Sequence, residues 1–257
     1  MANATRILFI SGEVAPFSEK SPIARIARTL PEALHETGEY ETRIMMPRYG
    51  TVSERRNRLH EVIRLSGSEI TVGDRTEVLR VKVASIPGIR LQVYFTDNDH
   101  YFKRKGVFHD KSGKLFEDNL ERAAFYSRAV IRTIRNLGWQ PDLIHAFGWI
   151  SGFVPYVVRT EFADDDLFRN ARIVYTPDTV DFEAVLSDAH KELLSLNITD
   201  SMEGKEPTDI GCDFADAVLH LPGVDTDSDA PVFPEDEEEQ MNQAVSVYDS
   251  ILNSVPA

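Results

Sequence analysis

Residues 11–34 read SGEVAPFSEKSPIARIARTLPEAL, and this stretch decides how the chain begins to fold. The apolar run Arg6–Ile10 precedes it and is typical of a buried parallel strand. After the loop, apolar residues recur at helical spacing, at Ile23, Ile26, Ala27, Leu30 and Leu34. The order strand, loop, helix predicts the first unit of an alternating α/β sheet.

The loop between these two elements has a composition that disfavours a bound anion. A helix N-terminus attracts anions because its first backbone N–H groups are free. We expect Ser21 to cap the helix and Pro22, which has no N–H to donate, to take its first position. Glu19 adds a negative charge to the same loop. A second negative charge about 5 Å away would cost ~3 kcal/mol at an effective dielectric of ~20.

The rest of the chain continues the alternation. Further strands are predicted at residues 42–47, 142–145, 172–176 and 217–221. The clearest helix spans 118–137, with Asp118 and Glu121 in a capping-box arrangement, and a second helical run covers 149–162. Between the strand at 42–47 and the helix at 118–137, three β-rich runs at 68–72, 77–83 and 90–95, separated by Gly73-Asp74 and Pro87-Gly88, predict hairpins.

The predicted fold class is therefore α/β, with a single Rossmann-like, doubly wound parallel sheet and an inserted β-hairpin region. In such sheets ligands bind beyond the carboxyl ends of the parallel strands. The loops that follow Ile10, His145 and Thr176 are expected to converge there.

Composition limits the classes of partner and the cellular location. The chain has 257 residues, 42% of them hydrophobic, and a formal charge of −14, which argues against nucleic acid or an anionic membrane surface. It has no long apolar run and no leader before the first strand, so we expect a cytoplasmic protein. Its single cysteine, Cys212, excludes an internal disulfide and disfavours a cysteine-based metal site.

Three segments are predicted along the chain. Residues 1–224 form the Rossmann-like domain, residues 225–236 an acidic linker, and residues 237–257 an amphipathic helix with a tail. Eight carboxylates lie between Asp225 and Glu239, without one basic residue. The terminal helix has an apolar face that either folds back on the domain or docks a protein partner.

Four segments resemble bacterial glycogen and starch synthases. They are SGEVAPFSEK at 11–20, MMPRYG at 45–50, DNDHYFKRKG at 97–106 and FEDN at 116–119. The resemblance covers roughly residues 6–222, which correspond to the N-terminal half of those enzymes. It implies one half of a two-domain GT-B glycosyltransferase, an enzyme class that moves glucose from ADP-glucose to an α-1,4-glucan.

The same resemblance places the chemistry and shows where this chain departs from it. It implies substrate-binding positions at Glu13, Asp118, Asn119, His145 and Trp149. The family's catalytic-loop lysine falls on Glu19, its active-site aspartate on Gly148 and its active-site histidine on Asp178. Catalytic residues therefore stay unknown, and we expect no cofactor and no metal.

Three functions follow from these expectations. The first is a catalytically degenerate relative that binds an α-glucan or a protein partner in glycogen metabolism. The alternative is one half of a split ADP-glucose glucosyltransferase, completed by a separate nucleotide-binding chain, because the sequence ends where the family's second domain would begin. The third is an active transferase that uses Asp118, Asp178 or Glu183 as acid or nucleophile.

Overall fold

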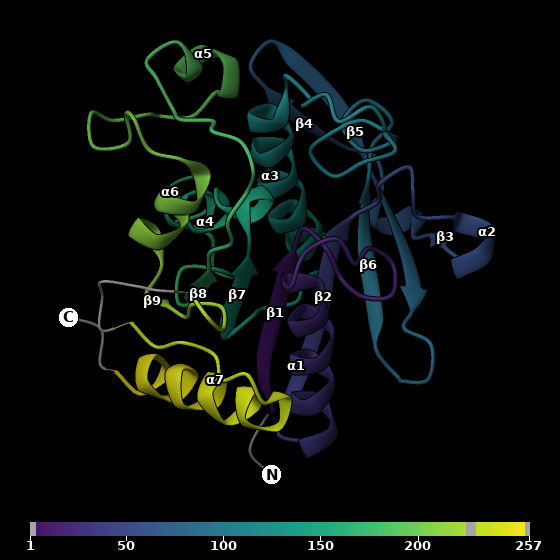
Figure 1. Cartoon of the computed structure of the whole chain (residues 1–257), viewed down its shortest axis with the longest axis vertical. Helices are drawn as coiled ribbons and strands as arrows, with labels where there is room; N and C mark the ends of the chain where they lie inside the picture. The colour runs from purple at the N-terminus through teal and green to yellow at the C-terminus, as the bar shows by residue number, and fades with distance from the viewer. Residues whose placement is uncertain (1–3, 225–229, 255–257) are drawn as a thin grey trace.

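The computed structural model describes residues 4–224 and 230–254, and a nine-stranded sheet runs through it (Figure 1). Along the main path the strand order is β3-β5-β6-β2-β1-β7-β8-β9, and β4 pairs with β5. The strands are β1 Thr5–Ser11, β2 Tyr40–Pro47, β3 His60–Glu61, β4 Ser68–Val72, β5 Arg75–Ser85, β6 Gln92–Asp97, β7 Leu143–Phe147, β8 Arg172–Thr176 and β9 Ala217–Val218.

The sheet has a parallel centre and an antiparallel edge. Strands β6, β2, β1, β7, β8 and β9 pair in parallel, whereas β3, β4 and β5 pair antiparallel. The predicted Rossmann-like sheet with an inserted hairpin region is confirmed. The strand order reverses direction between β1 and β7, which is where a doubly wound sheet opens a crevice for ligands.

Helices cover the sheet in two groups. In the first, α1 (Ile23–Thr37) packs on β1 and β2 and also contacts α7 (Glu237–Leu252). In the second, α3 (Asn119–Leu137) contacts α4 (Val154–Thr160), which in turn contacts α6 (Pro207–Phe214). The shorter elements are α2 Glu54–Asn57, α5 His190–Leu194 and the 3₁₀ turns η1 Ile63–Leu65 and η2 Trp149–Ser151. Within the described ranges no helix has the length and apolarity to span a bilayer.

Two predicted helix caps and the extent of one predicted helix are wrong. Helix α1 begins after Pro22, and no side chain caps it, so Ser21 is not its N-cap. Asp118 precedes α3 but makes no capping hydrogen bond, because its carboxylate pairs with Arg104 instead. The run predicted at 149–162 divides into η2 and α4, since Pro155 belongs to the first turn of a helix.

The terminal helix α7 folds back on the sheet. Asp236 caps it by accepting N–H groups from Glu238 and Glu239 at 2.8 and 3.3 Å. Its buried residues contact α1 and β8, and they include Ala244, Val247, Tyr248 and Ile251. The apolar face that was a candidate docking surface is therefore covered within the chain. Part of the predicted acidic linker, residues 225–229, lies outside the described residues.

Helix α3 fixes the strand ends on which the candidate site is built. The buried Tyr126 hydroxyl lies 2.9 Å from the Ser11 carbonyl oxygen and 3.0 Å from that of Met45. These carbonyls belong to the carboxyl-terminal ends of β1 and β2. Tyr126 therefore joins both strands to the helix that crosses behind them.

Candidate functional site

A pocket of about 460 Å³ opens at the carboxyl ends of the central strands, where the sequence predicted that ligands bind. The loop after β1, the segment after β8 and the stretch Lys105–Asp110 form its walls. A smaller recess beneath it reaches down to β7 and η2. Residues that line one or both include Glu13, Lys20, Ser21, Val107, Phe108, His109, Gly148, Trp149, Asp178 and Val180.

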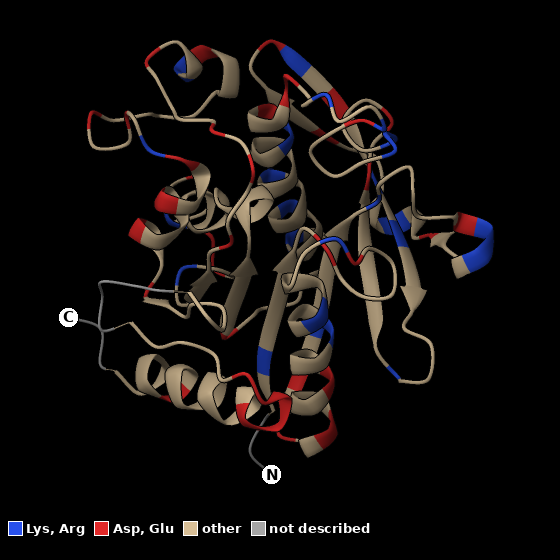
Figure 2. Cartoon of the chain, viewed as in Figure 1, with Lys and Arg blue, Asp and Glu red and all other residues tan. Residues whose placement is uncertain are grey.

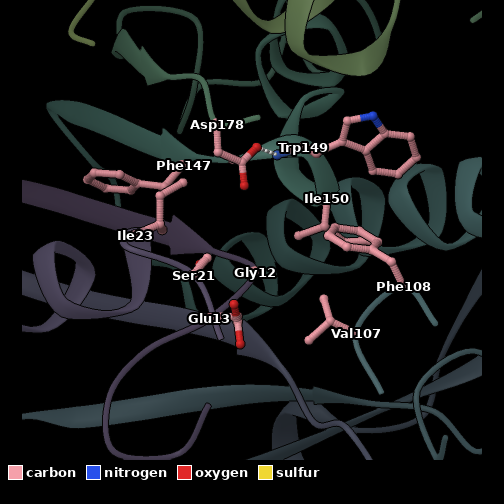
Figure 3. Close-up of a pocket in the computed structure, with 11 residues that line it drawn as sticks. Gly12, Glu13, Ser21, Ile23, Val107, Phe108, Phe147, Trp149, Ile150 and Asp178 are labelled. Carbon is pink, nitrogen blue, oxygen red and sulfur yellow. Dashed lines mark hydrogen bonds between the residues drawn. The ribbon is translucent and has the colours of Figure 1, made fainter. Parts of the chain in front are cut away.

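Two carboxylates stand at the floor of this pocket, on opposite sides of the recess (Figure 3). Glu13 is 5% exposed, and its Oε1 accepts hydrogen bonds from the Ser18 hydroxyl at 2.5 Å and the Lys20 backbone N–H at 3.0 Å. Asp178 accepts the Trp149 backbone N–H at 2.6 Å through Oδ1. The lining cations, Lys20 and Lys105, belong to the outer pocket, so the floor is acidic.

The Asp178 carboxyl titrates close to neutral pH. Its pKa is raised to about 6, chiefly by burial and to a smaller degree by the nearby charge of Glu13, while the hydrogen bond from the Trp149 N–H acts in the opposite direction. A carboxyl group with this pKa is present in both protonation states near pH 6. It therefore offers a ligand hydroxyl either an acceptor or a donor.

Gly148 leaves the space that the Asp178 carboxylate occupies. Gly148 has a φ of +77°, and a Cβ at this position would lie 2.9 Å from Asp178 Oδ2 and 2.9 Å from Ile23 Cδ1. Few residues other than glycine adopt its backbone conformation, with a ψ of 171°. The Asp178 carboxylate therefore occupies the space beside Gly148 that a side chain on residue 148 would need.

The wall at 105–110 is held in place by residues behind it. Arg104 makes two hydrogen bonds to Asp118, at 2.5 and 2.6 Å, and the Asn119 amide donates to the Phe108 carbonyl at 3.2 Å. The buried Arg122 donates to the Val107 carbonyl, to the Tyr101 carbonyl at 2.9 Å and to Asn119 Oδ1 at 2.6 Å. Asp118 and Asn119, expected to bind substrate, do not line the pocket but support the loop that does.

His145 also lies away from the pocket. Its ring is fully buried, with Nδ1 2.6 Å from the Tyr248 hydroxyl, Nε2 2.9 Å from Thr176 Oγ1, and Phe147 stacked on it at 3.9 Å between ring centroids. Burial lowers its pKa well below the ordinary value, so the imidazole is neutral at pH 7. Both ring nitrogens are engaged, and neither is free to bind a ligand.

Trp149 is fully buried as well, and it contributes to the pocket mainly through its backbone. The indole packs edge-on against Phe108 and Phe182, at centroid distances of 5.5 and 5.2 Å. Its backbone N–H holds Asp178. The indole thus supports the aromatic wall, and its packing against Phe108 and Phe182 accounts for its burial.

Glu19 does not take the place expected from the sequence pattern. Its side chain is exposed and does not line the pocket, whereas the neighbouring Lys20 does. The like-charge repulsion expected from Glu19 is therefore not directed at the pocket. Spacing along a sequence cannot predict which of two adjacent loop residues lines a pocket, because that depends on loop conformation.

Sequence reasoning missed the wall formed by Val107, Phe108 and His109. His109 lines the pocket and packs against Phe182 at a centroid distance of 5.8 Å. The sequence offered one signal for this wall. Arg104, in the motif at 97–106, pairs with Asp118, in the motif at 116–119, and the wall lies between these two motifs. In the part of the chain that the structure describes, no three His, Cys, Asp or Glu side chains are grouped to hold a metal ion.

Comparisons with known proteins were made for the sequence and the fold. The sequence model of the family described as starch synthase catalytic domain matches residues 6–219. Glycogen synthase of Chlorobium limicola is 41% identical over 182 residues, which are 70% of this chain and 37% of that protein. Glycogen synthase of Chlorobaculum tepidum is 39% identical over 228 residues, 87% of this chain and 46% of that protein. The chain thus spans less than half the length of these relatives.

A solved structure shares the fold. The catalytic domain of starch synthase IV from Arabidopsis thaliana, bound to ADP and acarbose, superposes with a TM-score of 0.73 at 18% sequence identity. The superposition covers 97% of this chain and 50% of that one. The sheet and its helices therefore correspond to one half of a two-part glycosyltransferase fold.

Proposed function

The chain belongs to the starch synthase catalytic domain family, and from this membership we propose that it binds an α-1,4-glucan in the pocket between Glu13 and Asp178 without transferring glucose to it. Membership confirms the resemblance that the sequence motifs predicted. The ligand class is inferred from the relatives, which are glycogen synthases, and from the chemistry of the pocket.

The acidic floor of the pocket is the observation that carries the proposal. Glu13 and Asp178 present carboxylate oxygens, which accept hydrogen bonds from sugar hydroxyl groups. Phe108 and Val107 add an apolar wall, against which the C–H face of a glucose ring packs. A phosphate group would meet two negative charges at this depth, so the floor favours a neutral sugar over a nucleotide.

The absence of transfer is inferred from positions 148 and 178. The family pattern has an acid at the first and a histidine at the second, whereas this chain has Gly148 and Asp178. A general acid or base acts only from a suitable geometry, and here the carboxylate comes from a different strand end and is bonded to the Trp149 N–H. A glucan-binding role requires the carboxylates but not the family's catalytic arrangement.

Cosedimentation of the purified chain with glycogen tests the binding. We expect saturable binding that added ADP-glucose leaves unchanged, and a loss of about tenfold in affinity for Glu13→Gln, because the amide replaces one acceptor with a donor. Glu36→Gln, an exposed residue of α1, is the matched control and should bind normally. Equal binding by both variants, or no binding by either the variants or the parent chain, contradicts the pocket assignment.

A separate assay tests the inferred lack of transfer. The chain is incubated with ADP-glucose labelled in the glucose and with maltohexaose, and the product is analysed for chain lengthening. We expect no lengthened product above the rate without protein. Sustained transfer by the purified chain, abolished in Asp178→Asn, would show an active enzyme with a relocated carboxylate and overturn this part of the proposal.

A further inference from the structure

A second concave site lies away from the glucan pocket, between α2 and the turn that joins β5 to β6. This groove has a volume of about 810 Å³, within the range of small-molecule sites. Its charged lining residues are three arginines that come from both sides, Arg56 and Arg58 from one and Arg90 from the other. Figure 2 shows the basic stretch of α2 at the edge of the molecule, beyond β3.

These arginines are unusual in a chain of formal charge −14. Many other arginines of the chain pair with carboxylates, as in the Arg128–Glu161 pair at 2.7 Å. By contrast, within the described residues no carboxylate oxygen lies within 4.0 Å of the side-chain nitrogens of Arg56, Arg58 or Arg90. Like charges gathered without a counter-charge repel one another, so the groove gains most from an anion.

The nearby carboxylate of α2 is already engaged elsewhere. Glu54, the first residue of the helix, accepts from Lys82 Nζ at 2.7 Å and pairs with Arg48 on the sheet side. Both contacts lower the pKa of Glu54, which keeps it ionised and directed away from the groove. The charge of the groove is therefore not neutralised by the helix that carries it.

The backbone at the end of α2 fixes one rim of the groove. Arg58 ends α2 with a φ of +52°, the left-handed region that residues with a Cβ rarely adopt. Its N–H donates to the Glu54 carbonyl, which fixes the turn that carries Arg56 and Arg58 on one rim.

The floor of the groove is apolar. Ile86 is 1% exposed, and Phe17, at 8%, packs edge-on against Phe95 with 5.0 Å between ring centroids. Guanidinium groups above an apolar floor match a ligand with an anionic group and a flat body, because the planar fork of arginine pairs with two phosphate oxygens at once.

We propose that this groove binds a small phosphorylated molecule, with Arg56, Arg58 and Arg90 holding the phosphate and the apolar floor supporting its ring. The site is independent of the proposed glucan pocket, since no residue lines both. A phosphate with three guanidinium neighbours is also favoured over a carboxylate, which offers fewer acceptor oxygens.

Calorimetric titration of the full chain with inorganic pyrophosphate and with ADP tests the proposal. We expect saturation with one site for both probes, and tighter binding of ADP if its ring uses the apolar floor. Arg56→Ala and Arg90→Ala should each weaken binding about tenfold. Arg55→Ala removes the same charge from the same helix but lies outside the groove, and should change affinity by less than about twofold.

A further variant separates binding from folding. Arg58→Gly suits the left-handed backbone, so it should unfold no more easily than the parent chain while it binds pyrophosphate about tenfold more weakly. If Arg55→Ala weakens binding as much as Arg56→Ala, the interaction is diffuse charge attraction and the site is rejected. A lack of saturation by either probe at about 10 mM rejects it as well.

Discussion

The wall and the floor of the glucan pocket differ in how their charges are satisfied. Behind the wall, Arg104 is paired with Asp118, and Arg122 donates to the carbonyls of Tyr101 and Val107, so both guanidinium groups have partners. In the floor, Glu13 and Asp178 are both acidic and have no cationic partner within 4.0 Å among the described residues. The difference separates residues that shape the pocket from residues that are available to a ligand.

Two of the motifs that this chain retains lie in the support of the wall, and motifs at the floor are altered. The segments at 97–106 and 116–119 match the family pattern, and the structure uses their charged residues to hold the loop at 105–110. Two of the departures, at 148 and 178, lie side by side at the floor, since a Cβ on Gly148 would be 2.9 Å from Asp178 Oδ2. The scaffold of the pocket is thus retained while its floor is rebuilt.

The largest expected effect is in the wall. Arg122→Ala should lower the free energy of unfolding by about 4 kcal/mol, because it leaves the buried carbonyls of Tyr101 and Val107 without a donor and opens a cavity. Urea unfolding followed by circular dichroism measures the change. Arg55→Ala, on the exposed face of α2, is the control and should shift it by less than about 0.5 kcal/mol. A loss below about 1 kcal/mol for Arg122→Ala would show that the wall does not depend on it.

A smaller loss of stability is expected at Gly148, beside Asp178 in the floor. Gly148→Ala should cost about 2–3 kcal/mol, because its φ of +77° disfavours a Cβ and that atom would lie 2.9 Å from Asp178 Oδ2. Gly38→Ala, with a φ of +76° and open space around it, measures the backbone part alone. The additional loss of stability in Gly148→Ala over Gly38→Ala measures the steric clash with Asp178. This additional loss should be smaller when Gly148→Ala is made in an Asp178→Ala background. An additional loss that stays the same in that background would mean that the two positions are not coupled.

The smallest effect depends on pH and tests the charge of the floor. The folded pKa of Asp178, about 6, lies above its usual value of 3.8, so the native state binds a proton more tightly than the unfolded chain. The resulting stabilisation is complete below pH 3.8 and is lost as the pH rises through 6. Asp178→Asn should therefore be more stable than the parent chain by about 1–2 kcal/mol at pH 7, with the difference closing near pH 4.

Unfolding in urea at several pH values measures this difference. Asp181→Asn is the matched control, because Asp181 lines the outer pocket but its side chain is 80% exposed, and it should show no such trend. A difference between Asp178→Asn and the parent chain that stays constant from pH 4 to pH 7 would place the carboxylate in a water-like environment, in conflict with the floor described above.

Much of the fold could be predicted from local patterns. The strand at 6–10, the helix stripe from Ile23 to Leu34 and the helix ended by Gly138 were predicted close to their observed bounds, because apolar spacing and glycine stops act over a few residues. Helix caps were less predictable. Asp118 is a residue type that often caps helices, but its carboxylate pairs with Arg104, which follows strand β6.

For the site, the sequence determined the residue types and the tertiary structure decided their use. Spacing alone identified the loops after β1, β7 and β8 as the place for a ligand, since parallel strands end at one edge of a sheet. Only the packed chain stacked His145 on Phe147, placed Lys20 rather than Glu19 in the lining of the pocket, and fitted Asp178 beside Gly148. Those outcomes depend on contacts between segments far apart in sequence, whose geometry no local pattern contains.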